Sequence, residues 1–100
     1  MNKERIKAYI YGAGKEYRKL IEFSSPLRDK LDILGVVTTT DIGIDVLDGY
    51  KVIRPIEINP SEMDYVIIAI GAWREVAELL IAQGIDKTKI IRSSVFYRAN

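Results

Sequence analysis

Residues 6–16 read IKAYIYGAGKE, a β-branched and aromatic run that ends at two closely spaced glycines. The run predicts a buried strand over residues 6–11 that enters a tight turn at Gly12. From Lys15 onward, apolar residues recur three and four positions apart, which predicts an amphipathic helix. A strand, a glycine turn and a helix in this order are typical of the opening unit of an α/β fold.

The rest of the chain alternates between the same two patterns. Short apolar runs predict further strands over residues 33–38, 50–53, 65–70 and 89–92. A short helical segment is expected from Ser25-Pro26 to about residue 31, and a longer helix is expected to end before Gly84. The alternation predicts a three-layer, Rossmann-like α/β domain with an open, mostly parallel sheet of about five strands.

Composition limits the classes of protein to which the chain can belong. Its 100 residues, 48% of them hydrophobic, predict a single domain over residues 1–100. The chain has no cysteine and no histidine, which excludes disulfides, thiolate metal sites and histidine-dependent catalysis. The formal charge of +1 predicts no nucleic-acid partner, and the lack of a long apolar run predicts a soluble, cytoplasmic protein without a membrane partner.

The turn Gly12-Ala13-Gly14 is the strongest candidate for a binding site. Glycines there let the free N–H groups at the start of the helix face an anion, and Lys15 follows directly, so the turn predicts a site for a phosphate-bearing ligand. The alternative is that the glycines only make the turn.

The full dinucleotide fingerprint is incomplete in this chain. It requires a third glycine or alanine where Tyr17 stands, and an acidic residue where Thr38 ends the second predicted strand. The cofactor therefore stays undetermined, with a nucleotide sugar favoured over NAD(P).

The first strand, turn and helix are similar in sequence to a second segment that lies 59 residues further along the chain. Residues 9–16, YIYGAGKE, align with residues 68–75, IAIGAWRE, and the apolar stripes that follow also align. A duplication of one segment, or the same local requirements of a strand, a turn and a helix, would explain this similarity equally well. The aligned turns complete the predicted set of binding residues, which comprises Gly12, Ala13, Gly14, Lys15, Thr38, Gly71, Trp73 and Arg74.

Three residues of this set lie in the second turn. Since the carboxyl ends of adjacent parallel strands form the site in such folds, we expect the strands that end at Gly12 and Gly71 to be neighbours. Lys15 and Arg74 begin aligned helices, where cations are disfavoured unless an anion lies nearby. Trp73 either stacks on a nucleobase or covers the core. We find no candidate catalytic residues and no metal ligands.

Five short motifs resemble a known group of domains: IYGAG at 10–14, GVV at 35–37, DGYKVI at 48–53, DYVIIAIG at 64–71 and QGI at 83–85. They are similar to the Rossmann-like N-terminal domains of bacterial surface-polysaccharide enzymes, such as sialic-acid and bacillosamine-type sugar acyltransferases and capsular nucleotide-sugar epimerases or dehydratases. The resemblance implies that Gly12, Ala13 and Gly14 form the phosphate-side turn. Thr38 departs from the aspartate that many of these relatives have.

The predicted function is a nucleotide or nucleotide-sugar binding module that does no chemistry itself. The resemblance implies that the chain is the N-terminal part of a larger protein, a sugar-modifying transferase of polysaccharide biosynthesis. One alternative is a structural or subunit-pairing domain, as in a homo-oligomer, that has lost its ligand. An NAD-dependent oxidoreductase is less favoured, because the chain has no substrate domain and no histidine or cysteine to work in one.

Overall fold

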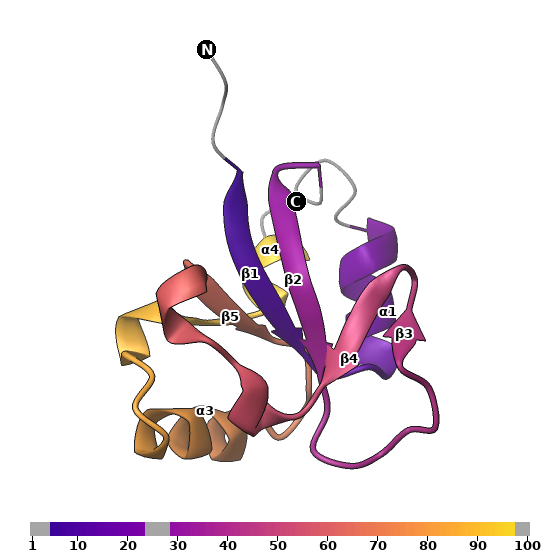
Figure 1. Ribbon diagram of the computed structural model, residues 1–100. Helices are drawn as coiled ribbons and strands as arrows, with labels where there is room; N and C mark the ends of the chain where they lie inside the picture. Colours follow the sequence, from indigo (N-terminus) through magenta and orange to yellow (C-terminus); the bar gives the residue numbers. More distant parts are fainter. Residues whose placement is uncertain (1–4, 24–28, 98–100) are drawn as a thin grey trace.

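The computed structural model describes residues 5–23 and 29–97, which form one sheet with helices on both faces (Figure 1). The strands of the sheet are β1 (Ile6–Tyr11), β2 (Leu31–Val37), β3 (Val46–Leu47), β4 (Tyr50–Ile53), β5 (Tyr65–Ile68) and β6 (Ile90–Arg92). They lie in the order β3-β4-β2-β1-β5-β6. Every described pairing is parallel except that of the short edge strand β3 with β4.

The connections carry the helices. These are α1 (Lys15–Phe23), α3 (Trp73–Ala82), α4 (Ser94–Tyr97) and three 3-10 turns, η1 (Pro55–Glu57), η2 (Pro60–Glu62) and η3 (Lys87–Lys89). The helical segment expected from Ser25-Pro26 begins outside the described residues. Among the residues that the structure describes, no helix has both the length and the hydropathy that crossing a membrane requires.

Side chains of β1 alternate between two apolar cores, one on each face of the sheet. Ala8 and Ile10 pack with the buried residues of α1 and with Phe96 of α4, which together we call the α1-side core. Tyr9 and Tyr11 pack with buried residues of α3, in what we call the α3-side core. The period of two along the strand therefore produces the three layers.

The predicted fold class is confirmed, including the parallel pairing of β1 with β5. The sheet has six described strands rather than about five, because the chain before β4 folds back as β3 through a turn at Asp48 (φ 54°) and Gly49 (φ 88°). The predicted strands over 33–38 and 65–70 are shifted at their ends, since the structure has Leu31–Val37 and Tyr65–Ile68.

Candidate functional site

The five parallel strands end together at one edge of the sheet, which we call the carboxyl edge. At this edge, four backbone N–H groups just past a strand donate to the last carbonyl of a neighbouring strand: Thr38 to Ile53 at 2.9 Å, Gly12 to Val37 at 2.8 Å, Ala69 to Tyr11 at 2.8 Å and Ser93 to Ile68 at 2.9 Å. These bonds fix the starting points of the loops that follow β2, β1, β5 and β6, four of the five loops that leave the carboxyl edge.

Strand β1 marks the point where the chain changes direction across the sheet. From β1 the connection through α1 leads to β2 over one face, whereas the connection from β5 through α3 leads to β6 over the other. Loops that leave in opposite directions open a crevice between them, and ligands of open α/β folds bind at such a crevice. The turns after β1 and β5 are therefore the place where a fold of this type would bind a ligand.

Gly12 is required by the structure itself. Its φ is 118°, and a Cβ at this position would lie 2.5 Å from the carbonyl oxygen of Ala69 and 2.6 Å from Cγ1 of Ile70. The turn after β1 packs directly on the end of β5, and only glycine fits there. The structural explanation of Gly12 is sufficient by itself.

Gly14 has no such explanation. A Cβ built on it would meet nothing within 4 Å, its φ is outside the left-handed region, and the residue is exposed. Its carbonyl accepts the N–H of Arg18 at 3.0 Å, so Gly14 precedes the first turn of α1. The first N–H groups of a helix have no acceptor within the helix, and with the helix dipole they favour an anion at this point.

The first turn of α1 carries side chains of both charges. Lys15 is exposed, and the carboxylate of Glu16 lies 3.8 Å from Nζ of Lys19. Ala13 is half-buried and packs against the α1-side core. Ala13 therefore anchors the turn to the α1-side core, while Gly14 remains exposed to solvent.

Thr38 lies next to this turn with an unsatisfied hydroxyl. The residue is 7% exposed, and its Oγ1 has no hydrogen-bond partner among the described residues. Val36 belongs to the α1-side core and Val37 to the α3-side core, so alternation directs Thr38 toward the side of α1. An orphaned buried hydroxyl costs about 1–3 kcal/mol, and a bound ligand, ion or water would satisfy it.

Tyr17 occupies the position of the missing third glycine and has a structural role there. It is fully buried, and its hydroxyl donates to Oδ2 of Asp48 in the β3–β4 turn at 2.7 Å. Burial, followed by the contact with Asp48, raises the pKa of Tyr17 well above its ordinary value. The tyrosine fastens α1 to the edge hairpin.

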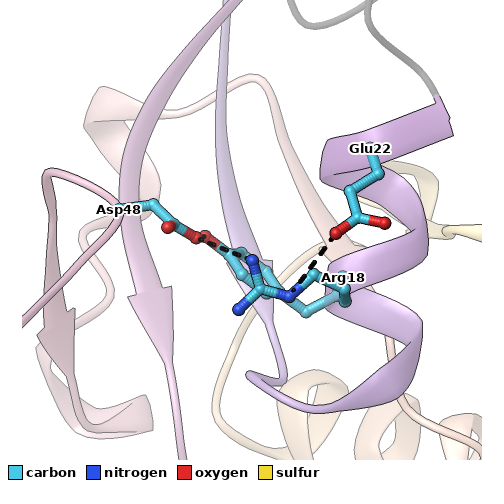
Figure 2. Close-up of polar contacts among 4 residues, drawn as sticks. Arg18, Glu22 and Asp48 are labelled. Atoms are coloured by element: carbon cyan, nitrogen blue, oxygen red, sulfur yellow. Dashed lines mark hydrogen bonds and ion pairs between the residues drawn. The ribbon is translucent and has the colours of Figure 1, made fainter.

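A second link between α1 and the hairpin runs through Arg18, which lies between two carboxylates (Figure 2). Its Nη1 is 3.9 Å from Oδ2 of Asp48, and its Nε is 4.0 Å from Oε2 of Glu22. All three side chains are substantially exposed, so water weakens these ion pairs.

Trp73 and Arg74 form a different environment at the start of α3. The indole is half-buried and packs against the α3-side core. The guanidinium carbon of Arg92 lies 4.2 Å from the ring centroid, and that of Arg74 lies 5.2 Å from it. Trp73 and Arg74, together with the exposed Gly71, Ala72 and Glu75, line a shallow hollow of about 250 Å³.

Two arginines at the carboxyl edge are absent from the sequence-based set. Arg54 directly follows β4, is half-buried, and donates from Nη1 to the carbonyl oxygen of Thr39 at 2.7 Å. Arg92 is the last residue of β6. A signal was present in the sequence, because each one is at or just past the end of a predicted strand, where the residues of a parallel sheet gather.

A larger hollow lies at the opposite edge of the sheet. It has a volume of about 640 Å³ and is lined by Arg5, Lys7, Asp32, Ser61, Glu62, Met63 and Asp64. Charges of both signs mix there, and ligand sites of open α/β folds form at the other edge. No cluster of acidic side chains suited to a metal ion is found among the described residues.

Comparisons with known proteins identify a family and a related fold. The family model described as C2185-like, N-terminal matches residues 4–91. No curated protein gives a significant match. Among solved structures, the crystal structure of RSP, a Rex-family repressor, matches with a TM-score of 0.65 at 17% identity, covering 97% of this chain and 60% of that one. The chain thus spans about 60% of the repressor chain, and at this identity the likeness concerns the fold.

These findings correct the functional prediction. The assignment to surface-polysaccharide enzymes is wrong, and with it the transferase and nucleotide-sugar roles, because the matching family model and structure belong to neither. The motifs behind that assignment are strand ends and glycine turns, which Rossmann-like folds share whatever their ligand. The exclusion of a nucleic-acid partner is also contradicted, since the matching structure is a repressor. Net charge averages over the whole surface and misses local patches.

Proposed function

The chain belongs to the C2185-like N-terminal family, and we propose that this member is the ligand-binding domain of a regulatory protein, which senses a phosphate-bearing small molecule. The phosphate binds at the backbone N–H groups where Gly14 leads into α1. Gly12 and Ala13 shape this turn, and Thr38 lies beside it.

Gly14 is the observation that carries the proposal. An exposed glycine without steric or conformational need costs backbone entropy and gives nothing to the fold. At the start of a helix of nine residues, beside the crevice between β1 and β5, its lack of a side chain leaves room for a ligand to reach the backbone. The unsatisfied hydroxyl of Thr38 supports the same location.

The regulatory part of the proposal is supported by the likeness to a repressor, which extends over 97% of this chain. A regulator couples ligand binding to a second partner, and for a repressor the partner is nucleic acid. Ligand-induced movement at the carboxyl edge would be transmitted through the loops that start there.

Calorimetric titration with NAD⁺ and NADP⁺, which both carry a pyrophosphate, tests ligand binding. We expect binding to the wild type and at least about a tenfold loss in Gly14→Val, equivalent to 1.4 kcal/mol, because the branched side chain covers the approach to the backbone. Ala82→Val is the matched control, since it adds a β-branched side chain at an exposed position of α3. Equal affinity in the wild type and Gly14→Val, or no binding of either dinucleotide, would overturn the proposed site.

The regulatory role has its own test. Fluorescence anisotropy of a labelled duplex that carries the sequence upstream of this gene is measured with the full-length protein that contains this domain, in the presence and absence of the dinucleotide. We expect the ligand to change the apparent affinity for the duplex. If the duplex binds equally with and without ligand, or does not bind, the regulatory part is wrong.

A further inference from the structure

The residues that follow β2 lack the carboxylate that selects a ribose with a free 2′-hydroxyl. In dinucleotide-binding folds, an acidic residue near this point bonds the 2′-hydroxyl, whereas an arginine nearby accommodates a 2′-phosphate. Here three threonines, residues 38–40, follow the strand. The first carboxylate is that of Asp41, whose Oδ1 accepts the N–H of Gly43 at 2.8 Å. A phosphate at the end of β2 would therefore meet the exposed hydroxyl groups of Thr39 and Thr40 before any carboxylate.

The strand next to β2 places an arginine close to these threonines. Arg54 follows β4, the strand that pairs with β2, and Nη1 of Arg54 donates to the carbonyl oxygen of Thr39 at 2.7 Å. This bond uses one of the five N–H donors of the guanidinium. Glu57 accepts the backbone N–H of Arg54 at 3.0 Å, and no described carboxylate lies within ion-pair distance of the guanidinium itself.

Thr38 connects this arginine with the turn at Gly12. Its N–H donates to the carbonyl oxygen of Ile53, the residue before Arg54, while Gly12 donates to that of Val37, the residue before Thr38. Two strand spacings, about 10 Å, separate the end of β4 from the end of β1. The buried Oγ1 of Thr38 without a partner lies between them. A nucleotide with its pyrophosphate at Gly14 would extend its ribose across Thr38 toward Arg54.

We propose that this edge recognises an adenosine ribose that carries a 2′-phosphate, so that the ligand is NADP(H) in preference to NAD(H). The inference rests on the proposed function, because it assumes that the pyrophosphate binds at Gly14. Arg54 supplies charged donors to the 2′-phosphate, and the threonines at 38–40 replace the acidic residue that would repel it.

Competing titrations measure this preference on the full chain. We expect NADP⁺ to bind at least about tenfold more tightly than NAD⁺, which corresponds to 1.4 kcal/mol, and 2′,5′-ADP to bind more tightly than 5′-AMP by a similar factor. Because the extra contact is ionic and partly exposed, the ratio should fall as salt is raised.

Variants assign the preference to Arg54. Arg54→Gln should lower the affinity for NADP⁺ about tenfold and change that for NAD⁺ less than twofold, since only the contact with the phosphate is lost. Lys51→Gln removes the same charge from an exposed position of β4 and should change neither affinity. Circular dichroism and a thermal melt establish that each variant is folded. Arg54→Lys, which keeps the charge, is expected to retain part of the preference for NADP⁺.

The outcomes separate this inference from the proposed function. If NAD⁺ binds as tightly as NADP⁺ and both lose affinity in Gly14→Val, the 2′-phosphate site is wrong and the sensor site stands. If the preference for NADP⁺ survives in Arg54→Gln, the assignment to Arg54 is wrong. If neither dinucleotide binds, both proposals fail.

Discussion

The unit β1–α1 and the unit β5–α3 share one sequence pattern but have different environments. Gly12 and Gly71 hold equivalent positions, 59 residues apart. A Cβ on Gly12 would lie 2.5 Å from the carbonyl oxygen of Ala69, whereas a Cβ on Gly71 would meet nothing within 4 Å. The first turn packs on the end of β5, and the second is open. A shared strand-turn-helix pattern therefore fixes the order of the elements and leaves their surroundings free to diverge.

The helices of the two units differ in the same way. In α1, the apolar stripe of Tyr17, Leu20 and Ile21 is buried, because the helix packs on the sheet and also contacts α4. In α3, Val76 and Leu80 are buried, but Leu79 is 59% exposed. Helical spacing predicts a buried stripe of Val76, Leu79 and Leu80 in this helix, and for Leu79 this prediction is wrong. Helical spacing gives the direction of the apolar face, and neighbouring elements determine its width.

Replacing the two equivalent glycines by alanine should give the largest contrast between the units. Gly12→Ala combines the strain of a φ of 118° with a collision at the end of β5, and we expect a loss of about 4 kcal/mol in the free energy of unfolding. Gly71→Ala should change stability by less than about 1 kcal/mol, because space is available. Urea denaturation measures both. Equal losses would show that the two turns are packed alike.

The equivalent leucines sharpen the comparison of the helices. Leu20 is 2% exposed and Leu79 is 59% exposed, although they occupy aligned positions. Leu20→Ala should destabilise the protein by about 3 kcal/mol through loss of buried surface and creation of a cavity. Leu79→Ala should cost less than about 0.5 kcal/mol. A large loss for Leu79→Ala would mean that α3 is covered on its outer side in solution.

The contrast also explains what the sequence could predict. Runs of β-branched residues located the parallel strands, and the rule for open α/β sheets correctly made β1 and β5 neighbours. Short-range patterns carry this information. The orphaned hydroxyl of Thr38, the position of Arg54 beside Thr39 and the exposure of Leu79 depend on which strands and helices become neighbours, so local patterns do not contain them.

The family was misjudged for a related reason. Turn motifs such as DGYK at residues 48–51 report a hairpin between β3 and β4, and many folds use the same turn chemistry. Tyr17 departs from the dinucleotide fingerprint, which requires glycine or alanine at its position. The structure gives its cause, a hydrogen bond to Asp48 that closes the hairpin onto α1.

Tyr17 should make the first unit sensitive to alkali, whereas its equivalent in the second unit, Val76, cannot ionise. Since the folded state raises the pKa of Tyr17 above the unfolded value of about 10, its contribution to stability is complete below pH about 10 and is lost as the pH rises further. Tyr17→Phe should cost about 1 kcal/mol at neutral pH, the value of one hydrogen bond. Burial also raises the pKa of Tyr11, so the difference between wild type and Tyr17→Phe isolates Tyr17. Identical alkaline unfolding curves would contradict this role.

The smallest expected effect concerns Trp73, which holds the position equivalent to Gly14 and is the one tryptophan of the chain. Arg92 approaches its ring centroid to 4.2 Å and Arg74 to 5.2 Å, so the second unit presents cations stacked on a ring where the first presents open backbone. A cation–π contact at an exposed site contributes about 0.5–1 kcal/mol. Arg92→Gln should therefore destabilise the protein by about that amount, and Arg74→Gln by less, because its cation is farther from the ring.

Indole emission reports these contacts separately from stability. The charge of Arg92 acts on the excited ring, so Arg92→Gln should shift the emission more than Arg74→Gln does. Lys87→Gln, which removes a charge from the exposed turn η3, is the control and should leave the emission unchanged. If Arg74→Gln and Arg92→Gln shift the emission equally, the difference in distance has no consequence in solution. If neither shifts it, the arginines do not stack on Trp73, and the second turn is as open as the first.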